Sequence, residues 1–64
     1  MTISGVYRTE RGTIWRLVHL EGGSMRVELL TNETWVPGPI AMAGLRLSIQ
    51  CKELTAAAIR KLPP

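Results

Sequence analysis

The chain has 64 residues with eight Lys or Arg, five Glu and no Asp, and its formal net charge is +3. A chain this short buries only about 60% of the surface that its unfolded form exposes, so the sequence predicts one marginal core and a homo-oligomer. One cysteine and one histidine exclude an intramolecular disulfide and a four-ligand zinc site within one chain.

The composition predicts a small cytoplasmic domain that meets an anionic partner. No apolar run approaches the roughly 18 residues of a membrane span, and the first residues show no basic or hydrophobic export signal, which predicts no membrane partner. The sequence pI of 9.8 favours a partner that carries negative charge. With only three aromatic residues and no Phe, the core is expected to be aliphatic.

The first half of the chain predicts three strands, over residues 2–8, 13–21 and 24–31, because β-branched and aromatic residues alternate with polar ones. Gly12 suits the positive φ of the first turn. Gly22-Gly23 reads as a two-residue hairpin loop. That loop predicts a register in which Trp15 faces Leu30, Leu17 faces Glu28 and His19 faces Arg26 on one side of the sheet.

A second turn is predicted at Asn32-Glu33, followed by a short strand over residues 34–36. As a two-residue loop it pairs Leu30 with Trp35 and Leu29 with Val36. Combined with the first register, it places Trp15, Leu30 and Trp35 in a row across three neighbouring strands.

The second half predicts a fifth strand over residues 43–51, where apolar and polar residues alternate after Pro37-Gly38-Pro39. A helix over residues 54–62 follows, with Thr55 as its N-cap. An alternative remains for residues 48–54, in which Ser48 caps a longer helix and the strand ends near Leu47. The expected fold is therefore mostly β: a strongly bent antiparallel meander or small barrel of four or five strands, closed by one C-terminal helix.

The residues that carry chemistry do not form an enzyme signature. Cys51 lies in the apolar phase of its predicted strand, where a thiol is usually buried and inert, so a Cys51–His19 nucleophile and base is disfavoured. His19 and Glu21 are too few for a metal site. Gly22-Gly23 joins two strands and lacks the following Lys of a phosphate loop. The sequence predicts no enzyme activity, no metal and no cofactor.

One face of the predicted meander carries the candidate binding surface, because bulky apolar side chains and basic residues meet there. Three alternatives account for it: the C-terminal helix or first strand covers it, a second copy covers it, or it is a nucleic-acid platform. In the platform, tryptophans stack on bases while arginines, Arg46 among them, hold phosphates. The partner-binding candidates are Arg8, Arg11, Trp15, Arg16, His19, Arg26, Leu30 and Trp35.

Three short segments carry a resemblance to a known family: Gly5-Val6-Tyr7-Arg8, Gly12-Thr13-Ile14-Trp15-Arg16-Leu17-Val18 and Trp35-Val36-Pro37. Over residues 5–42 the chain resembles short bacterial proteins of unknown function with an SH3-like barrel, although it lacks their Arg between Val36 and Pro37. The resemblance implies a barrel of bent strands and no enzyme activity. The small size is also similar to that of binding proteins carried by phages or plasmids.

The function expected from the sequence is a non-enzymatic binding module that acts on nucleic acid in a regulatory or accessory role. The alternative is a protein-interaction module, an inhibitor or adaptor, that uses the Trp15/Trp35 face.

Overall fold

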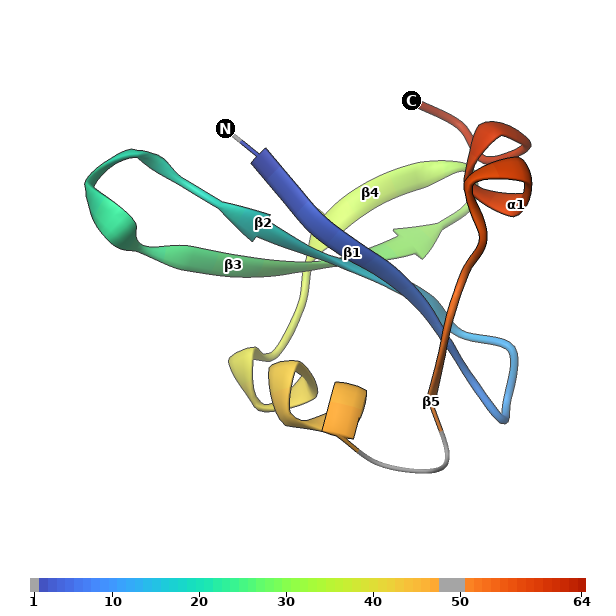
Figure 1. Cartoon of the computed structure of the whole chain (residues 1–64), viewed down its shortest axis with the longest axis horizontal. Helices are drawn as coiled ribbons and strands as arrows, with labels where there is room; N and C mark the ends of the chain where they lie inside the picture. Colours follow the sequence, from blue (N-terminus) through green and yellow to red (C-terminus); the bar gives the residue numbers. More distant parts are fainter. Residues whose placement is uncertain (1, 48–50) are drawn as a thin grey trace.

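The protein is mostly β, as the sequence predicts. The structure is a computed structural model that describes residues 2–47 and 51–64. Within these residues, five antiparallel strands form one sheet in the order β4-β3-β2-β1-β5 (Figure 1). The elements in chain order are β1 (Thr2–Thr9), β2 (Ile14–His19), the 3-10 turn η1 (Glu21–Gly23), β3 (Met25–Thr31), β4 (Thr34–Pro37), the 3-10 helix η2 (Ile40–Leu47), β5 (Cys51–Glu53) and α1 (Ala56–Arg60).

The first four strands form a meander, and the fifth returns to its beginning. β5 pairs with the end of β1, where Thr9 lies opposite Cys51 and Tyr7 lies opposite Glu53. β4 and β5 are therefore the two edges of the described sheet (Figure 1).

The turn between β1 and β2 has the positive φ that the sequence predicts for Gly12, which is +85°. The Gly12 amide donates to the carbonyl oxygen of Thr9 over 3.0 Å, and the Thr9 amide donates to the carbonyl oxygen of Thr13 over 3.0 Å. Glycine suits this position because it adopts a left-handed conformation without steric cost.

The loop between β2 and β3 has three residues, so the predicted two-residue Gly22-Gly23 loop is wrong. Glu21 belongs to the loop, and the Leu20 amide closes it by donating to the Ser24 carbonyl oxygen over 2.8 Å. Gly22 and Gly23 both have positive φ, +83° and +85°. One extra loop residue moves the pairing by one position, which exchanges the faces of a strand relative to its neighbour.

The turn between β3 and β4 confirms the second predicted register. Leu30 pairs with Trp35 and Leu29 pairs with Val36. Asn32 and Glu33 both have positive φ, +50° and +64°, as a two-residue loop of the primed type requires.

Residues 40–47 form η2, so the predicted strand over residues 43–51 is wrong for residues 43–47. Ala and Met favour helical over extended backbone, and the Met42 amide donates to the Pro39 carbonyl oxygen over 3.1 Å in the first turn. The helical turn also brings Met42 and Ala43 against the core. The part of the prediction that concerns residues 48–50, including a Ser48 cap, lies outside the described residues.

The predicted C-terminal helix is present but shorter, and Thr55 caps it as expected. The Ala58 amide donates to the Thr55 hydroxyl oxygen over 3.2 Å. Leu54, Ala58 and Leu62 are half-buried, whereas Ile59, expected on the same apolar face, is 37% exposed.

Val6 and Val18 are buried on one face of the sheet, where they lie opposite Arg16 and Arg26. The main hydrophobic cluster lies on the other face, where residues of η2 and β5 pack on it. Tyr7 and Trp15 stack at its centre, with ring centroids 4.7 Å apart and an angle of 24° between the rings. The expectation of an aliphatic core is therefore wrong, because two aromatic rings fill its middle. The buried members are Tyr7, Trp15, Leu17 and Val27, and the half-buried residues packed on them are Leu29, Met42, Ala43 and Cys51.

The positive φ of Glu33 predicts that Glu33→Gly stabilises the fold. A non-glycine residue in the left-handed region costs about 1 kcal/mol, part of which is offset by the greater freedom of glycine in the unfolded chain. We expect the free energy of unfolding to rise by about 0.5 kcal/mol, measured by urea denaturation. Glu33→Ala removes the same charge without relieving the backbone, so an equal gain in Glu33→Ala contradicts this account.

Candidate functional site

The two tryptophans lie on opposite faces of the sheet, so the predicted row of Trp15, Leu30 and Trp35 is wrong. Trp15 lies opposite Leu29 and is fully buried in the core. Trp35 lies opposite Leu30 on the other face and is half-buried. The cause is the three-residue loop, which exchanges the faces of β3 relative to β2. Trp15 is therefore not available to stack on a base.

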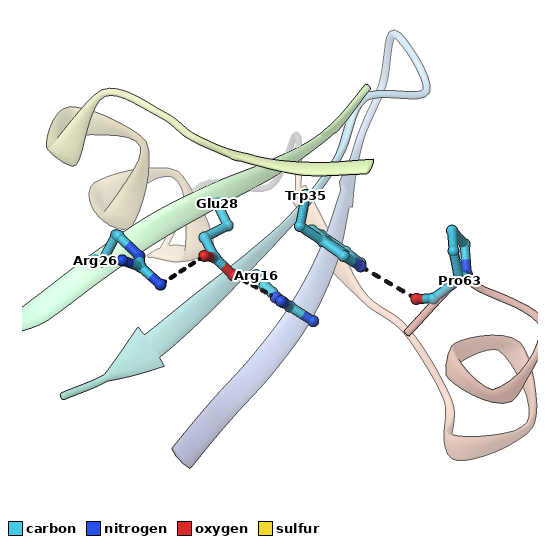
Figure 2. Close-up of polar contacts among 5 residues, drawn as sticks. All are labelled: Arg16, Arg26, Glu28, Trp35 and Pro63. Carbon is cyan, nitrogen blue, oxygen red and sulfur yellow. Dashed lines mark hydrogen bonds and ion pairs between the residues drawn. The ribbon is translucent and has the colours of Figure 1, made fainter. Parts of the chain in front are cut away.

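The face opposite the Tyr7–Trp15 stack carries a group of neighbouring polar side chains, whose hydrogen bonds and ion pairs are marked in Figure 2. Arg26 Nη2 lies 2.8 Å from Glu28 Oε2, and Arg16 Nε lies 2.7 Å from Glu28 Oε1. The Arg16 guanidinium carbon lies 4.2 Å from the centroid of the Trp35 ring. Trp35 Nε1 in turn donates to the Pro63 carbonyl oxygen over 3.1 Å. We call the residues Arg16, Arg26, Glu28 and Trp35 the Trp35 cluster.

Glu28 is the charge that organises this cluster. Only 6% of its surface is exposed, and a carboxylate removed from water is costly unless cations and hydrogen bonds compensate it. Arg16 and Arg26 each satisfy one of its two oxygens. Arg16 lies directly opposite Glu28 in the neighbouring strand, the position at which side chains of two strands come closest. These two arginines are therefore committed to the protein's own carboxylate.

Trp35 is fixed on both its face and its edge. The Arg16 guanidinium covers its ring, an attractive cation–π arrangement, and Pro63 accepts its only N–H. Leu30 packs in register beside it and is half-buried, as the sequence predicts. A ring that is already covered by a guanidinium is a poor platform for a base.

His19 lies at the end of β2 on the side of Trp15 and Leu17. It pairs with Met25 and Thr2, so the predicted pairing of His19 with Arg26 is wrong. His19 and Cys51 flank opposite ends of β1, opposite Thr2 and Thr9. Seven residues of a strand span about 23 Å, which separates the two side chains too far for a nucleophile and its base.

A second group of basic side chains lies where β1, β5 and the first turn meet. Arg8 lies directly opposite Lys52 in the β1–β5 pair, and both side chains are exposed. Arg11 is exposed in the adjoining turn beside Gly12. We call Arg8, Arg11 and Lys52 the basic edge. It shares no residue with the Trp35 cluster.

Lys52 is the member of the basic edge that the sequence prediction missed. It lies one residue beyond the predicted strand 43–51, and its pairing with Arg8 joins positions far apart in the chain. Adjacent basic residues give a sequence signal, but Arg8 and Lys52 become neighbours only through the fold.

The described residues contain neither a group of metal ligands nor a membrane-spanning helix, and no related protein indicates a site. In residues 2–47 and 51–64, no three His, Cys, Asp or Glu side chains cluster in a way that would hold a metal ion. No helix in the described part of the chain is long and apolar enough to cross a membrane. Comparison of the chain with protein-family models, curated proteins and solved structures finds no match.

The commitment of two arginines to Glu28 predicts that Glu28→Gln destabilises the fold. The neutral amide keeps the shape but leaves the two arginines without a counter-charge, so we expect a loss of about 2 kcal/mol in the free energy of unfolding. Urea denaturation followed by circular dichroism measures it. Glu21→Gln, in the exposed η1 turn, is the matched control and should stay within about 0.5 kcal/mol of wild type. Equal effects of the two substitutions contradict the role assigned to Glu28.

Proposed function

We propose that this protein is a non-enzymatic nucleic-acid-binding module that holds phosphates at its basic edge. The observation that carries this proposal is the placement of Arg8 directly opposite Lys52, with both side chains exposed. Like charges facing each other across two strands are destabilising, and a phosphate bound between them would relieve their repulsion.

The distribution of ion pairs supports this choice of surface. Within residues 2–47 and 51–64, the ion pairs join Arg16 and Arg26 to Glu28, and the members of the basic edge take no part in them. Glu53 follows Lys52 in β5 but lies opposite Tyr7, so the alternation of the strand turns it to the other face. The basic edge therefore offers charges that are free to meet an anionic partner.

This geometry favours contact with the phosphate backbone over reading of bases. Trp15 is buried and Trp35 is covered by Arg16, so neither ring is open for base stacking. Three exposed cations without a stacking platform correspond to weak, sequence-independent binding in an accessory role.

Three expectations from the sequence extend this proposal. The return of β5 to β1 supports an SH3-like arrangement of the strands. Self-association is supported by the exposure of large apolar side chains, of which Ile40 is 63% exposed, and light scattering on the full chain tests it. We also propose a cytoplasmic location, for which the basic composition and the nucleic-acid partner are the support.

Binding to a single-stranded oligonucleotide should depend steeply on salt. Three phosphate contacts predict a slope of about −2 for the logarithm of the association constant against the logarithm of the salt concentration. Fluorescence anisotropy with a labelled oligonucleotide, between about 50 mM and about 200 mM salt, measures this slope. Lys52→Ala and Arg8→Ala should each weaken binding and reduce the slope by about 0.7.

Lys61→Ala is the matched control, because it removes one exposed lysine at the end of α1, away from the basic edge. It should leave the slope close to that of wild type. No binding at low salt, or an equal effect of Lys52→Ala and Lys61→Ala, would reject the proposed surface.

A further inference from the structure

The contact between Trp35 and the residues after α1 is a second candidate binding site. Trp35 belongs to β4, an edge strand of the sheet, and its Nε1 donates to the carbonyl oxygen of Pro63 over 3.1 Å (Figure 2). Pro63 is half-buried and Pro64 is exposed. Arg16 lies over the ring, so the edge that carries Nε1 is the part of the indole that meets the segment after α1. This edge combines apolar ring atoms with one N–H donor, so it can contact a ligand and bind a carbonyl at the same time.

Contacts within the sheet hold Trp35 in addition to the hydrogen bond to Pro63. Arg16 lies over the ring at 4.2 Å, and its own position is set by the 2.7 Å contact with Glu28. Leu30 lies beside Trp35 in the neighbouring strand. The indole is therefore preorganised, which lowers the entropy cost of binding a ligand there.

The residue after α1 that contacts Trp35 is Pro63, which lies between the half-buried Leu62 and the exposed Pro64. α1 ends at Arg60, and the last backbone donor before the prolines is the Leu62 amide, which bonds to the Ile59 carbonyl oxygen over 3.0 Å. Proline has no N–H and a fixed φ, so the two prolines offer only carbonyl acceptors and a stiff apolar surface. Packing against an aromatic ring together with carbonyl acceptance is the chemistry by which proline-rich segments are recognised.

We propose that Trp35 forms a binding site for a proline-containing peptide of another protein, and that the chain's own Leu62–Pro64 segment occupies this site when the partner is absent. The site uses residues of the Trp35 cluster and none of the basic edge, so it is independent of nucleic-acid binding. The partner would present a hydrophobic residue followed by consecutive prolines, with a free carbonyl directed at Trp35 Nε1.

The internal segment acts as a competitor that an external peptide can displace. A segment tethered by a short connection has an effective concentration in the millimolar range. Its one described side-chain hydrogen bond to the sheet is the Trp35–Pro63 contact. A partner peptide must therefore bind strongly enough to displace the internal segment. If only a fraction of the molecules has the site unoccupied, loss of the internal segment raises the apparent affinity for the peptide by the reciprocal of that fraction.

The test is an NMR titration of the full chain with the peptide Arg-Lys-Leu-Pro-Pro, the sequence of residues 60–64, against the control peptide Arg-Lys-Leu-Ala-Ala. The chain has two tryptophans, and Trp35→Phe assigns their two indole N–H signals by removing one. The proline peptide should shift the Trp35 signal and leave that of Trp15 in place. The alanine peptide should bind at least about fivefold more weakly.

Two variants separate binding from folding. Trp35→Phe keeps an aromatic ring but removes the donor for the internal segment and the added peptide alike, so it is measured in the Pro63→Gly/Pro64→Gly background. There it should weaken peptide binding about 5- to 10-fold, as followed by signals of neighbouring residues such as Leu30. The double variant Pro63→Gly/Pro64→Gly loosens the internal segment and should strengthen binding of the added peptide about 3- to 10-fold. Glu21→Ala, in the η1 loop at the other end of the sheet from α1, is the control that should change neither value (Figure 1).

Three outcomes would overturn the proposal. The first is a Trp35 signal that responds to neither peptide in wild type and in the double glycine variant. The second is equal binding of the proline and alanine peptides. The third is a Trp35 shift that depends on protein concentration without added peptide, which would assign the site to a second copy of this chain.

Discussion

The register between β2 and β3 is the constraint on which the rest of the structure depends. A three-residue loop at Glu21–Gly23 places Arg16 opposite Glu28 and Leu17 opposite Val27. This single choice puts Trp15 in the core and Glu28 on the other face. With a two-residue loop, Glu28 would face Leu17 and would lie in the apolar layer, on the opposite face from Arg16. The register thus places the aromatic cluster on one face and Glu28 with its arginines, beside the buried Val6 and Val18, on the other.

The polar side chains of the charged face are arranged around Glu28, a buried carboxylate that requires counter-charges. Glu28 holds Arg16 and Arg26, and Arg16 in turn covers the ring of Trp35. These interactions remove two of the basic residues from the list of phosphate ligands and add a fixed indole at the sheet edge. The cations of the basic edge lie at the other side of the sheet, where β5 returns to β1. The two proposed sites therefore lie on separate parts of the sheet and can be tested separately.

Local sequence signals predicted the strands of the meander, the Asn32-Glu33 register and the Thr55 cap, because each rests on residues close together in the chain. They failed where the outcome depended on distant packing. Residues 40–47 form a 3-10 helix whose Met42 and Ala43 pack on the core. The local alternation of apolar and polar residues contains no information about this packing. Gly22-Gly23 is compatible with loops of two or three residues, and the structure has the three-residue loop that includes Glu21. The pairing of Lys52 with Arg8 depends on the return of β5 to β1. The candidate site therefore differs from the predicted one: it excludes Trp15, which is buried, and includes Lys52, which pairs with Arg8.

The register can be measured directly by NMR. The hydrogen bond from Leu20 to Ser24 makes that pair a hydrogen-bonded one, and the alternation of an antiparallel ladder then makes Leu17 and Val27 a close, non-hydrogen-bonded pair. The account predicts a strong nuclear Overhauser effect between the α-protons of Leu17 and Val27, and another between those of Trp15 and Leu29. In the register of a two-residue loop the close, non-hydrogen-bonded pair is Val18 and Val27, so a strong effect between their α-protons instead would contradict the register, and with it the opposite placement of the two tryptophans.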